Sequence, residues 1–230
     1  RQARLRDPEV RRAMVEERPD VSGMAAFITS AWHKLFPLGD PPEYEPAPEQ
    51  SVKAMAAREG RSPEEVTYDL MMADDGRGLL YIPILGYAHG DFDALHAMLV
   101  HPGSVLGLGD GGAHCGLLCD ASLPTYMLTH WVRDRSRGAR LGLEQAVHMQ
   151  TRGTASLYGF DDRGLLTPGY LADVNVIDFD ALACDAPTMV YDLPAGGRRL
   201  IQRARGYGAT VKRGVVVRED DEATGERPGV

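Results

Sequence analysis

The sequence lacks the features that mark membrane, secreted and disulfide-stabilised proteins. No apolar run approaches the roughly 18 residues needed to span a bilayer, and no signal peptide is visible. There are only three cysteines, Cys115, Cys119 and Cys184, and an odd number does not suggest a disulfide framework. A reducing compartment is the simpler interpretation, and we predict a cytoplasmic protein without a membrane partner.

An excess of positive charge is also lacking. The 230 residues include 25 Lys and Arg against 33 Asp and Glu, which gives a net charge of −8. Nucleic acids and acidic membranes attract basic surfaces, so this balance argues against either partner. Because 43% of the residues are hydrophobic, the chain can bury a core in one large domain or two small ones.

The first third of the chain has the pattern of short helices joined by a loop. Asp7 is a predicted cap for a helix that starts at Pro8. A second helix is predicted over residues 52–59, and a third starts at Pro63 behind a capping box and runs to about Ala73. The segment from Pro37 to Gln50 is rich in proline and acidic residues, so we expect a connector there and not a core element.

The middle of the chain predicts alternating strands and helices. Residues 79–85 are apolar enough for a strand, although Pro83 favours an irregular or edge position. A helix is expected after Asp91, then a short buried parallel strand over residues 104–108. Residues 143–158 are helical by pattern, with a break expected at Gly153.

From Asp162 onward the pattern changes to short strands separated by turns. Residues 173–177, 209–211 and 215–217 are rich in valine, and a turn at Lys212-Arg213-Gly214 joins the last two. We therefore expect a small β domain at the C-terminal end.

The stretch GLGDGGA, from Gly107 to Ala113, places one carboxylate at the end of an apolar strand among glycines. Barrel enzymes build their active sites at the C-terminal ends of the strands, so Asp110 is the candidate catalytic residue. An ordinary turn is the alternative, because Asp and Gly are common in loops.

Gly111 and Gly112, with Gly109, are candidates for close approach of the backbone to a substrate, since glycine has no Cβ. They serve only the turn in the competing interpretation. His114 is a candidate to orient Asp110 or to contact the substrate, and a histidine hydrogen-bonded to a loop backbone is equally compatible with the sequence.

Four blocks of the sequence resemble the D-aminoacylase (N-acyl-D-amino-acid deacylase) group of the amidohydrolase superfamily. They occur in the family's order and spacing over roughly the last two-thirds of the chain. The blocks are GLGDGGAHCGLLCDASLPTYMLTHWVRDR (107–135), LEQAVHMQTRGTASLYG (143–159), DRGLLTPGYLADVNVIDFD (162–180) and DLPAGGRRL (192–200).

The resemblance implies an α/β fold, namely the C-terminal part of a metal-dependent (β/α)8 TIM-barrel hydrolase followed by a small β-sandwich domain. Residues 1–160 are expected to form the barrel portion, with a helical insertion, and residues 161–230 the β-sandwich. The implied activity is hydrolysis of an amide C–N bond that is not a peptide bond, with an N-acyl-D-amino acid as the expected small-molecule substrate.

The resemblance implies that Asp110 is the family's strand-eight aspartate, which acts as general base and acid and can also touch the metal. The implied cofactor is Zn²⁺ or another divalent metal. The family's other ligands, a His-X-His pair among them, are not recognisable here, since no two of the seven histidines are separated by one residue. The chain also opens on RQARLRDPEV without an initiator Met, so we expect the remaining ligands in a missing N-terminal part. We expect the fragment alone to be inactive, and a homo-oligomer is compatible with the sequence.

Two clusters near Asp110 allow further interpretations. His114, Cys115, Cys119 and Asp120 have zinc-binding side chains, but their spacing is more typical of small buried cysteines than of a zinc site. Arg133 and Arg135 could clamp a substrate carboxylate, although a salt-bridged helix end fits the neighbouring Asp134 better.

The substrate is less defined than the reaction. Characterised D-aminoacylases follow the strand-eight aspartate with an arginine that holds the substrate carboxylate, whereas this chain has no arginine between Asp110 and Arg133. A cyclic amide or imide, or a carbamate, therefore stays open as substrate. A binding or assembly module that has lost catalysis is the alternative from a different functional class.

Overall fold

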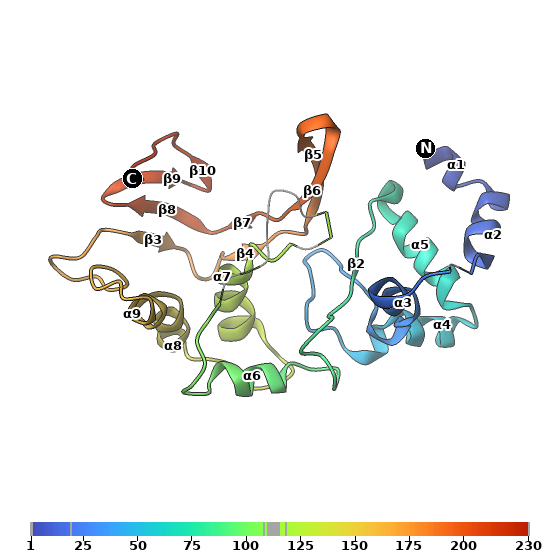
Figure 1. Ribbon diagram of the computed structural model, residues 1–230, viewed down its shortest axis with the longest axis horizontal. Coiled ribbons are helices and arrows are strands. Elements are labelled where there is room, and N and C mark those ends of the chain that lie inside the picture. The colour runs from blue at the N-terminus through green and yellow to red at the C-terminus, as the bar shows by residue number, and fades with distance from the viewer. Residues whose placement is uncertain (1, 19, 108, 110–115, 118, 230) are drawn as a thin grey trace. The chain divides into compact units, whose positions relative to one another are not determined.

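The computed structural model describes every residue except Arg1, Pro19, Leu108, 110–115, Leu118 and Val230. The chain divides into two compact units, residues 1–94 and 95–230. Helices and strands both occur, as Figure 1 shows. None of the helices in the described ranges combines the length and the apolar character required to cross a membrane.

Unit 1 is mainly helical, and the sequence explains how its helices begin and end. Asp7 caps α2 (Pro8–Glu16), with its carboxylate accepting from the backbone N–H of Glu9 at 2.8 Å. Gly60 ends α4 (Val52–Glu59) in the left-handed conformation, at φ +65°. The other helical elements of unit 1 are α1 (Gln2–Leu5), α3 (Gly23–Ser30), η1 (Trp32–Lys34), η2 (Pro48–Gln50) and α5 (Pro63–Gly76). These helix starts confirm the predictions from the capping residues.

The capping box at the start of α5 is present. Ser62 Oγ accepts from the backbone N–H of Glu65 at 3.2 Å, and Glu65 Oε2 accepts from the Ser62 N–H at 3.0 Å. The helix loses helical backbone angles at Ala73, which is where the sequence predicted its end.

The core of unit 1 lies between η1, α4 and α5. Leu35, Val52, Ala56 and Val66 are buried together, and the main-chain N–H of Val52 donates to the Leu35 carbonyl at 2.8 Å. Burial of this cluster is the main stabilising contribution expected for the unit.

The connector between Pro37 and Gln50 differs partly from its prediction. It contains turns and the short helix η2, as expected for a proline-rich segment, but Leu38 and the carboxylate residue Glu45 are buried. Glu45 is accommodated because its Oε1 accepts from the backbone N–H of Phe92 at 2.8 Å. The prediction that the connector stays out of the core was therefore wrong at these positions.

The strand predicted over residues 79–85 is short. Only β2 (Leu80–Tyr81) forms, and it pairs antiparallel with β1 (Phe36–Pro37). Pro83 cannot donate a ladder hydrogen bond, which accounts for the early end of the strand.

The helix predicted after Asp91 is α6 (Asp93–Leu99), whose first N–H donates to Asp91 Oδ1 at 3.1 Å. The strand predicted over 104–108 does not form in its described part, residues 104–107, and Val105 is 50% exposed. A strand needs a hydrogen-bonded neighbour, and no described strand pairs with this segment.

The helical part of unit 2 contains two π-helical segments that the sequence pattern did not predict. They are η3 (Met127–Asp134), which continues α7 (Leu123–Tyr126), and η4 (Met149–Gly153), which lies between α8 (Leu143–His148) and α9 (Thr154–Leu157). Gly153 marks the end of a π-helical segment inside a continuous helical stretch, so the break predicted there is not observed.

The C-terminal part of unit 2 is formed by strands that pair antiparallel. The largest sheet described has the order β10-β9-β8-β3, with β3 at one edge. Two smaller sheets pair β5 with β6 and β4 with β7. The strands are β3 (Val174–Ile177), β4 (Ala183–Cys184), β5 (Thr188–Leu193), β6 (Gly197–Ile201), β7 (Ala204–Arg205), β8 (Tyr207–Lys212), β9 (Val215–Glu219) and β10 (Glu222–Ala223).

The β8–β9 hairpin confirms the turn predicted from the sequence. Its two central residues, Arg213 and Gly214, both have positive φ, at 52° and 81°. This is the backbone of a two-residue hairpin loop whose twist matches the strands. The predicted domain boundary at residue 160 stays a prediction, although the described helices end at Leu157 and the strands of unit 2 begin at Val174.

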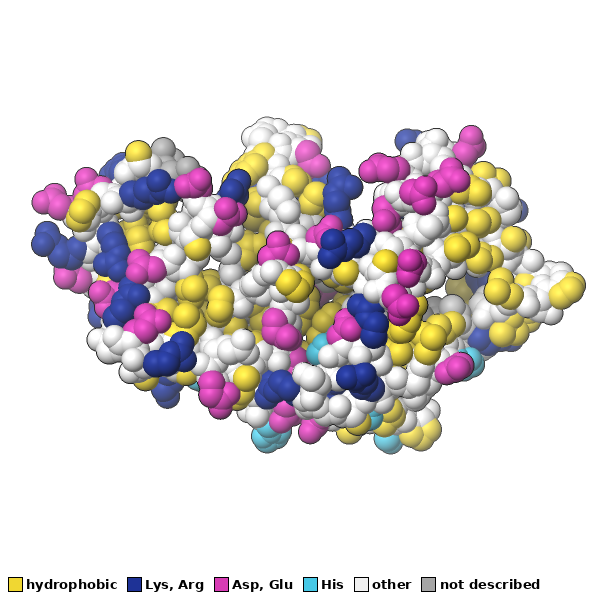
Figure 2. Space-filling model, turned by 180° about the vertical axis from the view of Figure 1, so that it is seen from behind, with side chains coloured by type: hydrophobic (Ala, Val, Ile, Leu, Met, Phe, Trp, Pro, Cys, Tyr) yellow, Lys and Arg dark blue, Asp and Glu magenta, His cyan; other side chains and the backbone are white. Residues whose placement is uncertain are grey.

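The described surface carries both signs of charge and several exposed apolar side chains. Figure 2 shows acidic and basic side chains interspersed over one face. Among the large apolar residues, Leu85, Leu166 and Leu117 are 85%, 84% and 78% exposed. These three side chains are therefore not part of the core in the described residues.

Candidate functional site

The catalytic and substrate-binding residues predicted from the sequence are Asp110, Gly111, Gly112 and His114. All four lie outside the described residues. The structure describes the two flanks of this stretch, which end at Gly109 on one side and start again at Gly116 on the other.

The two flanks lie against each other at Gly109. A Cβ at this position would lie 2.5 Å from the carbonyl oxygen of Asp120 and 3.1 Å from Leu123 Cδ1. At Gly107, by contrast, a Cβ would meet no atom within 4 Å. Gly109 is therefore required for the close approach of the backbone to the Asp120 segment.

Hydroxyl groups at the start of α7 connect the second flank to the strands of unit 2. The Ser122 hydroxyl donates to Gln202 Oε1, and the Gln202 amide donates to the Asp185 carbonyl at 2.8 Å. The hydroxyls of Thr125 and Tyr207 are 2.7 Å apart. The position of the chain just after the candidate site is thereby set by contacts to residues 185–207.

The described cysteines remain thiols. Burial, with the nearby Asp120 carboxylate, raises the pKa of the Cys119 thiol, and burial raises the pKa of Cys184 to about 11. Because the thiolate is the nucleophile, neither cysteine is activated for nucleophilic attack.

The described residues contain no group of three His, Cys, Asp or Glu side chains that could hold a metal ion. Of the four residues considered from the sequence as a zinc cluster, only Cys119 and Asp120 are described; His114 and Cys115 lie outside the described residues. A zinc site takes three or four protein ligands, so the described part of this chain does not fit a metal centre by itself.

The two arginines considered as a carboxylate clamp have structural partners. Arg133 pairs with Asp134 at 2.7 Å and donates to the backbone carbonyls of 179, 180 and 182, at 2.8 Å for Leu182. Arg135 is 1% exposed, donates to the Ala139 carbonyl at 2.6 Å, and lies over the Trp131 ring. The helix-end interpretation is confirmed for Arg133, while Arg135 is buried and not solvated.

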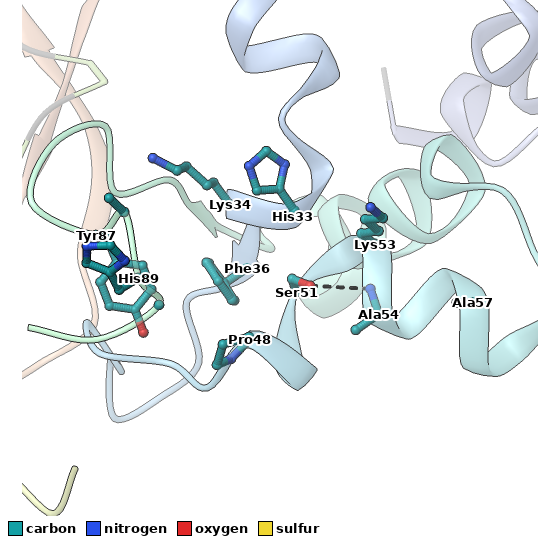
Figure 3. A pocket seen from close by; sticks show the side chains of 12 residues that line it. His33, Lys34, Phe36, Pro48, Ser51, Lys53, Ala54, Ala57, Tyr87 and His89 are labelled. Atoms are coloured by element: carbon teal, nitrogen blue, oxygen red, sulfur yellow. Dashed lines mark hydrogen bonds between the residues drawn. The ribbon is translucent and has the colours of Figure 1, made fainter.

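A pocket of about 460 Å³ lies within unit 1, and the sequence analysis did not predict it. Figure 3 shows His33 and Lys34 above Phe36, with Tyr87 and His89 on one side and Ser51 and Lys53 on the other. Two of the three lysines of the chain, Lys34 and Lys53, line this pocket, but no local sequence pattern indicates that they do. The full lining is His33, Lys34, Phe36, Pro48, Ser51, Lys53, Ala54, Ala57, Tyr87, Ala88, His89 and Gly90.

Comparison with known families identifies the chain. The sequence model of the amidohydrolase family matches residues 20–218. The chain belongs to the amidohydrolase family. The matched range includes both the stretch around Asp110 and most of the C-terminal strands.

The resemblance to D-aminoacylases is also confirmed, because the solved structures to which the amidohydrolase chain is similar include D-aminoacylases. One, described as defining a novel subset of amidohydrolases, is 26% identical with a TM-score of 0.43. Another, from work on the binuclear metal centre of D-aminoacylase, is 27% identical with a TM-score of 0.43. Each match covers 84% of this chain and 36% of the solved chain, so this amidohydrolase chain spans about a third of their length. No curated protein matches it.

Proposed function

We propose that this chain is the C-terminal part of a metal-dependent hydrolase that cleaves a non-peptide amide bond, with an N-acyl-D-amino acid as the favoured substrate. The observation that carries the proposal is the amidohydrolase match over residues 20–218, which includes Asp110. The similarity to D-aminoacylases favours this substrate class over cyclic amides and imides.

In this proposal Asp110 is the general base and acid. Amide hydrolysis requires removal of a proton from the attacking water and delivery of a proton to the leaving amine, and one carboxylate beside the scissile bond can do both. Gly111, Gly112 and His114 would contact the substrate next to it. The close packing of Gly109 against Asp120 supports a stretch whose two ends are held together.

The proposed architecture is the end of a (β/α)8 barrel over residues 1–160 and a small β-sandwich domain over 161–230. The division is supported by the change from helices, the last ending at Leu157, to antiparallel strands from Val174. The barrel's parallel strands would be completed by other parts of a longer protein.

The metal, which we propose to be zinc, would be held mainly by residues of that longer protein. The described residues provide no three-ligand group, and the chain corresponds to 36% of the D-aminoacylases it resembles. A divalent metal in such hydrolases lowers the pKa of water and polarises the carbonyl. We propose Asp110 as the ligand that this chain contributes.

Exposed apolar side chains support a partner region that covers them. Leu85, Leu117 and Leu166 are more than three-quarters exposed, and a covering segment would remove their apolar surface from water. The missing N-terminal part of the same enzyme is the proposed partner, and the acidic net charge supports neither nucleic acid nor an acidic membrane.

The test is turnover of N-acetyl-D- and N-acetyl-L-amino acids by the full-length protein loaded with zinc. We expect Asp110→Asn to lower kcat by about a thousandfold, because the amide cannot take up the proton, while KM changes little. Removing the metal with a chelator should abolish turnover, and zinc should restore it.

Asp120→Asn is the matched control, since it neutralises a carboxylate in the same stretch and should leave kcat close to the wild-type value. A near-normal kcat for Asp110→Asn would refute the catalytic role. A full-length protein that takes up no metal and hydrolyses no amide would favour the non-catalytic binding module.

A further inference from the structure

The pocket of unit 1 is formed by parts of the chain that are fixed to one another. The Tyr87 hydroxyl donates to the Pro46 carbonyl, and the Tyr87 ring packs edge-to-face on Phe36, with 6.1 Å between ring centroids. At Gly90, which has φ +74°, a Cβ would lie 2.7 Å from Pro48 Cγ, so only glycine lets residues 87–90 close against η2.

The wall of the pocket formed by Ser51 and α4 is also held in place by hydrogen bonds. Ser51 is buried and caps α4, its hydroxyl accepting from the Ala54 N–H at 3.3 Å (Figure 3). The Val52 N–H donates to the Leu35 carbonyl at 2.8 Å, which joins α4 to the segment that carries His33 and Lys34. The pocket is therefore pre-formed, which lowers the entropic cost of binding a ligand.

The polar side chains around the pocket are all cationic or potential hydrogen-bond donors. Lys34 and Lys53 come from different elements, and His33 and His89 add imidazole rings. None of the twelve lining residues is acidic, although the whole chain has a net charge of −8. Neither lysine forms an ion pair or a side-chain hydrogen bond with another described residue.

The remaining lining is mostly apolar. Phe36, Pro48, Ala54, Ala57 and Tyr87 present aromatic and aliphatic surface between the basic groups. A concave site with a mostly apolar lining and a few polar groups is the usual form of a small-molecule site. The apolar part requires a ligand with a hydrocarbon body, and the two ammonium groups require a negative charge on it.

We propose that this pocket binds a small carboxylate attached to an apolar group, such as an arylalkyl or acyl carboxylic acid. The apolar body contacts the aromatic and alanine side chains, and the carboxylate pairs with a lysine at the rim, where Figure 3 shows Lys34 and Lys53 on opposite sides of Phe36. A small inorganic anion offers no apolar surface, so it can pair only with the lysines. A neutral amide offers no charge, so it can contact only the apolar lining. The inference concerns unit 1 alone and does not rest on the proposed hydrolase activity.

The experiment is calorimetric titration of the full chain with three probes: phenylacetate, phenylacetamide and inorganic phosphate. We expect saturable binding of phenylacetate, at least about tenfold tighter than either of the other probes. The double variant Lys34→Gln/Lys53→Gln should lose about tenfold in phenylacetate affinity and bring it close to that of phenylacetamide.

Arg58→Gln is the matched control. Arg58 is exposed and cationic and lies on α4, as Lys53 does, but it does not line the pocket. It should bind phenylacetate as the wild type does. Ala57→Leu fills the apolar part and should weaken phenylacetate and phenylacetamide together. Absence of saturable phenylacetate binding, equal affinity for acid and amide, or unchanged affinity in the double lysine variant would each overturn the proposal.

Discussion

Single glycines determine where two backbone segments can touch in this chain. Gly109 packs on the Asp120 carbonyl, Gly90 packs on Pro48, and a Cβ at Gly206 would lie 2.8 Å from Leu182 Cα. Gly90 and Gly206 also have positive φ, whereas Gly109 is required by close approach alone. Gly109 borders the Asp110 stretch and Gly90 lines the unit 1 pocket. Substituting either glycine tests the backbone packing of a candidate site without changing its polar side chains.

Gly109→Ala should destabilise unit 2 by about 1–3 kcal/mol, because the new methyl group overlaps a backbone oxygen that cannot rotate away. The measurement is urea unfolding of the full chain. Gly107→Ala is the control, since a methyl group there meets open space, and it should change the free energy of unfolding by less than about 0.5 kcal/mol. Equal effects of the two substitutions would show that the flanks do not pack as described.

The ion pair between Asp173 and Lys212 makes part of the stability depend on pH. Lys212 Nζ donates to Asp173 Oδ2 at 2.6 Å, and the Arg213 N–H donates to Oδ1 at 2.9 Å. The hydrogen bond from Lys212 lowers the pKa of Asp173 below its ordinary value, and the Arg213 N–H acts in the same direction. A carboxyl whose folded pKa is lowered stabilises the fold above its unfolded pKa, and this contribution is lost as the pH falls through the folded pKa.

Asp173→Asn should therefore lower the free energy of unfolding by about 1 kcal/mol at neutral pH, a modest value because both side chains are partly exposed. The difference from the wild type should shrink as the pH falls below about 4, where the unfolded carboxyl begins to bind protons. Urea unfolding over this pH range checks it, with the exposed Asp161→Asn as control. A difference that stays constant with pH would contradict the ion-pair explanation.

At the scale of elements, helix ends depend on a few capping side chains. Ser62→Ala removes the hydroxyl that accepts from the Glu65 N–H, and we expect a loss of about 1 kcal/mol in the free energy of unfolding. The control is Ser22→Ala, since Ser22 precedes α3 without making a side-chain capping bond. Thermal unfolding of both variants checks the prediction, and similar losses for the two would contradict it.

The elements that the sequence could predict are those that depend on residues close together in the chain. The helices that start at Pro8 and Pro63, and the hairpin at Arg213-Gly214, depend on residues within a turn of one another, so their patterns are readable. The strand expected over 104–108 depends on a pairing partner, and the burial of Glu45 depends on the distant Phe92 N–H. Neither the partner strand nor a contact 47 residues away is encoded in a local pattern.

The two candidate sites also differ in whether they depend on consecutive residues or on contacts between distant parts of the chain. Asp110 was identified by its glycine-rich context and by a family resemblance, both of which are properties of consecutive residues. The unit 1 pocket was missed because Lys34, Lys53 and His89 come together only through the packing of η1, α4 and the loop after β2. The π-helical insertions have no composition signal of their own and were missed for that reason.

At the scale of the whole molecule, this amidohydrolase chain forms two compact units, residues 1–94 and 95–230. Its candidate base belongs to unit 2, and the described parts of both units lack a three-ligand metal group. In the function proposed above, the metal is shared with residues of a longer protein. Metal uptake is therefore the property that should differ most between this chain and a longer protein that contains it.

We expect the 230-residue chain to retain less than one Zn²⁺ per molecule after competition with a coloured chelator. Tight zinc sites need three or four ligands, and the described residues contain no group of three His, Cys, Asp or Glu side chains that could hold a metal ion. Zinc measured after gel filtration checks the prediction, and Cys184→Ser should leave the result unchanged. One tightly bound zinc that disappears in His114→Ala would contradict it and would assign a complete metal site to the cluster of His114, Cys115, Cys119 and Asp120.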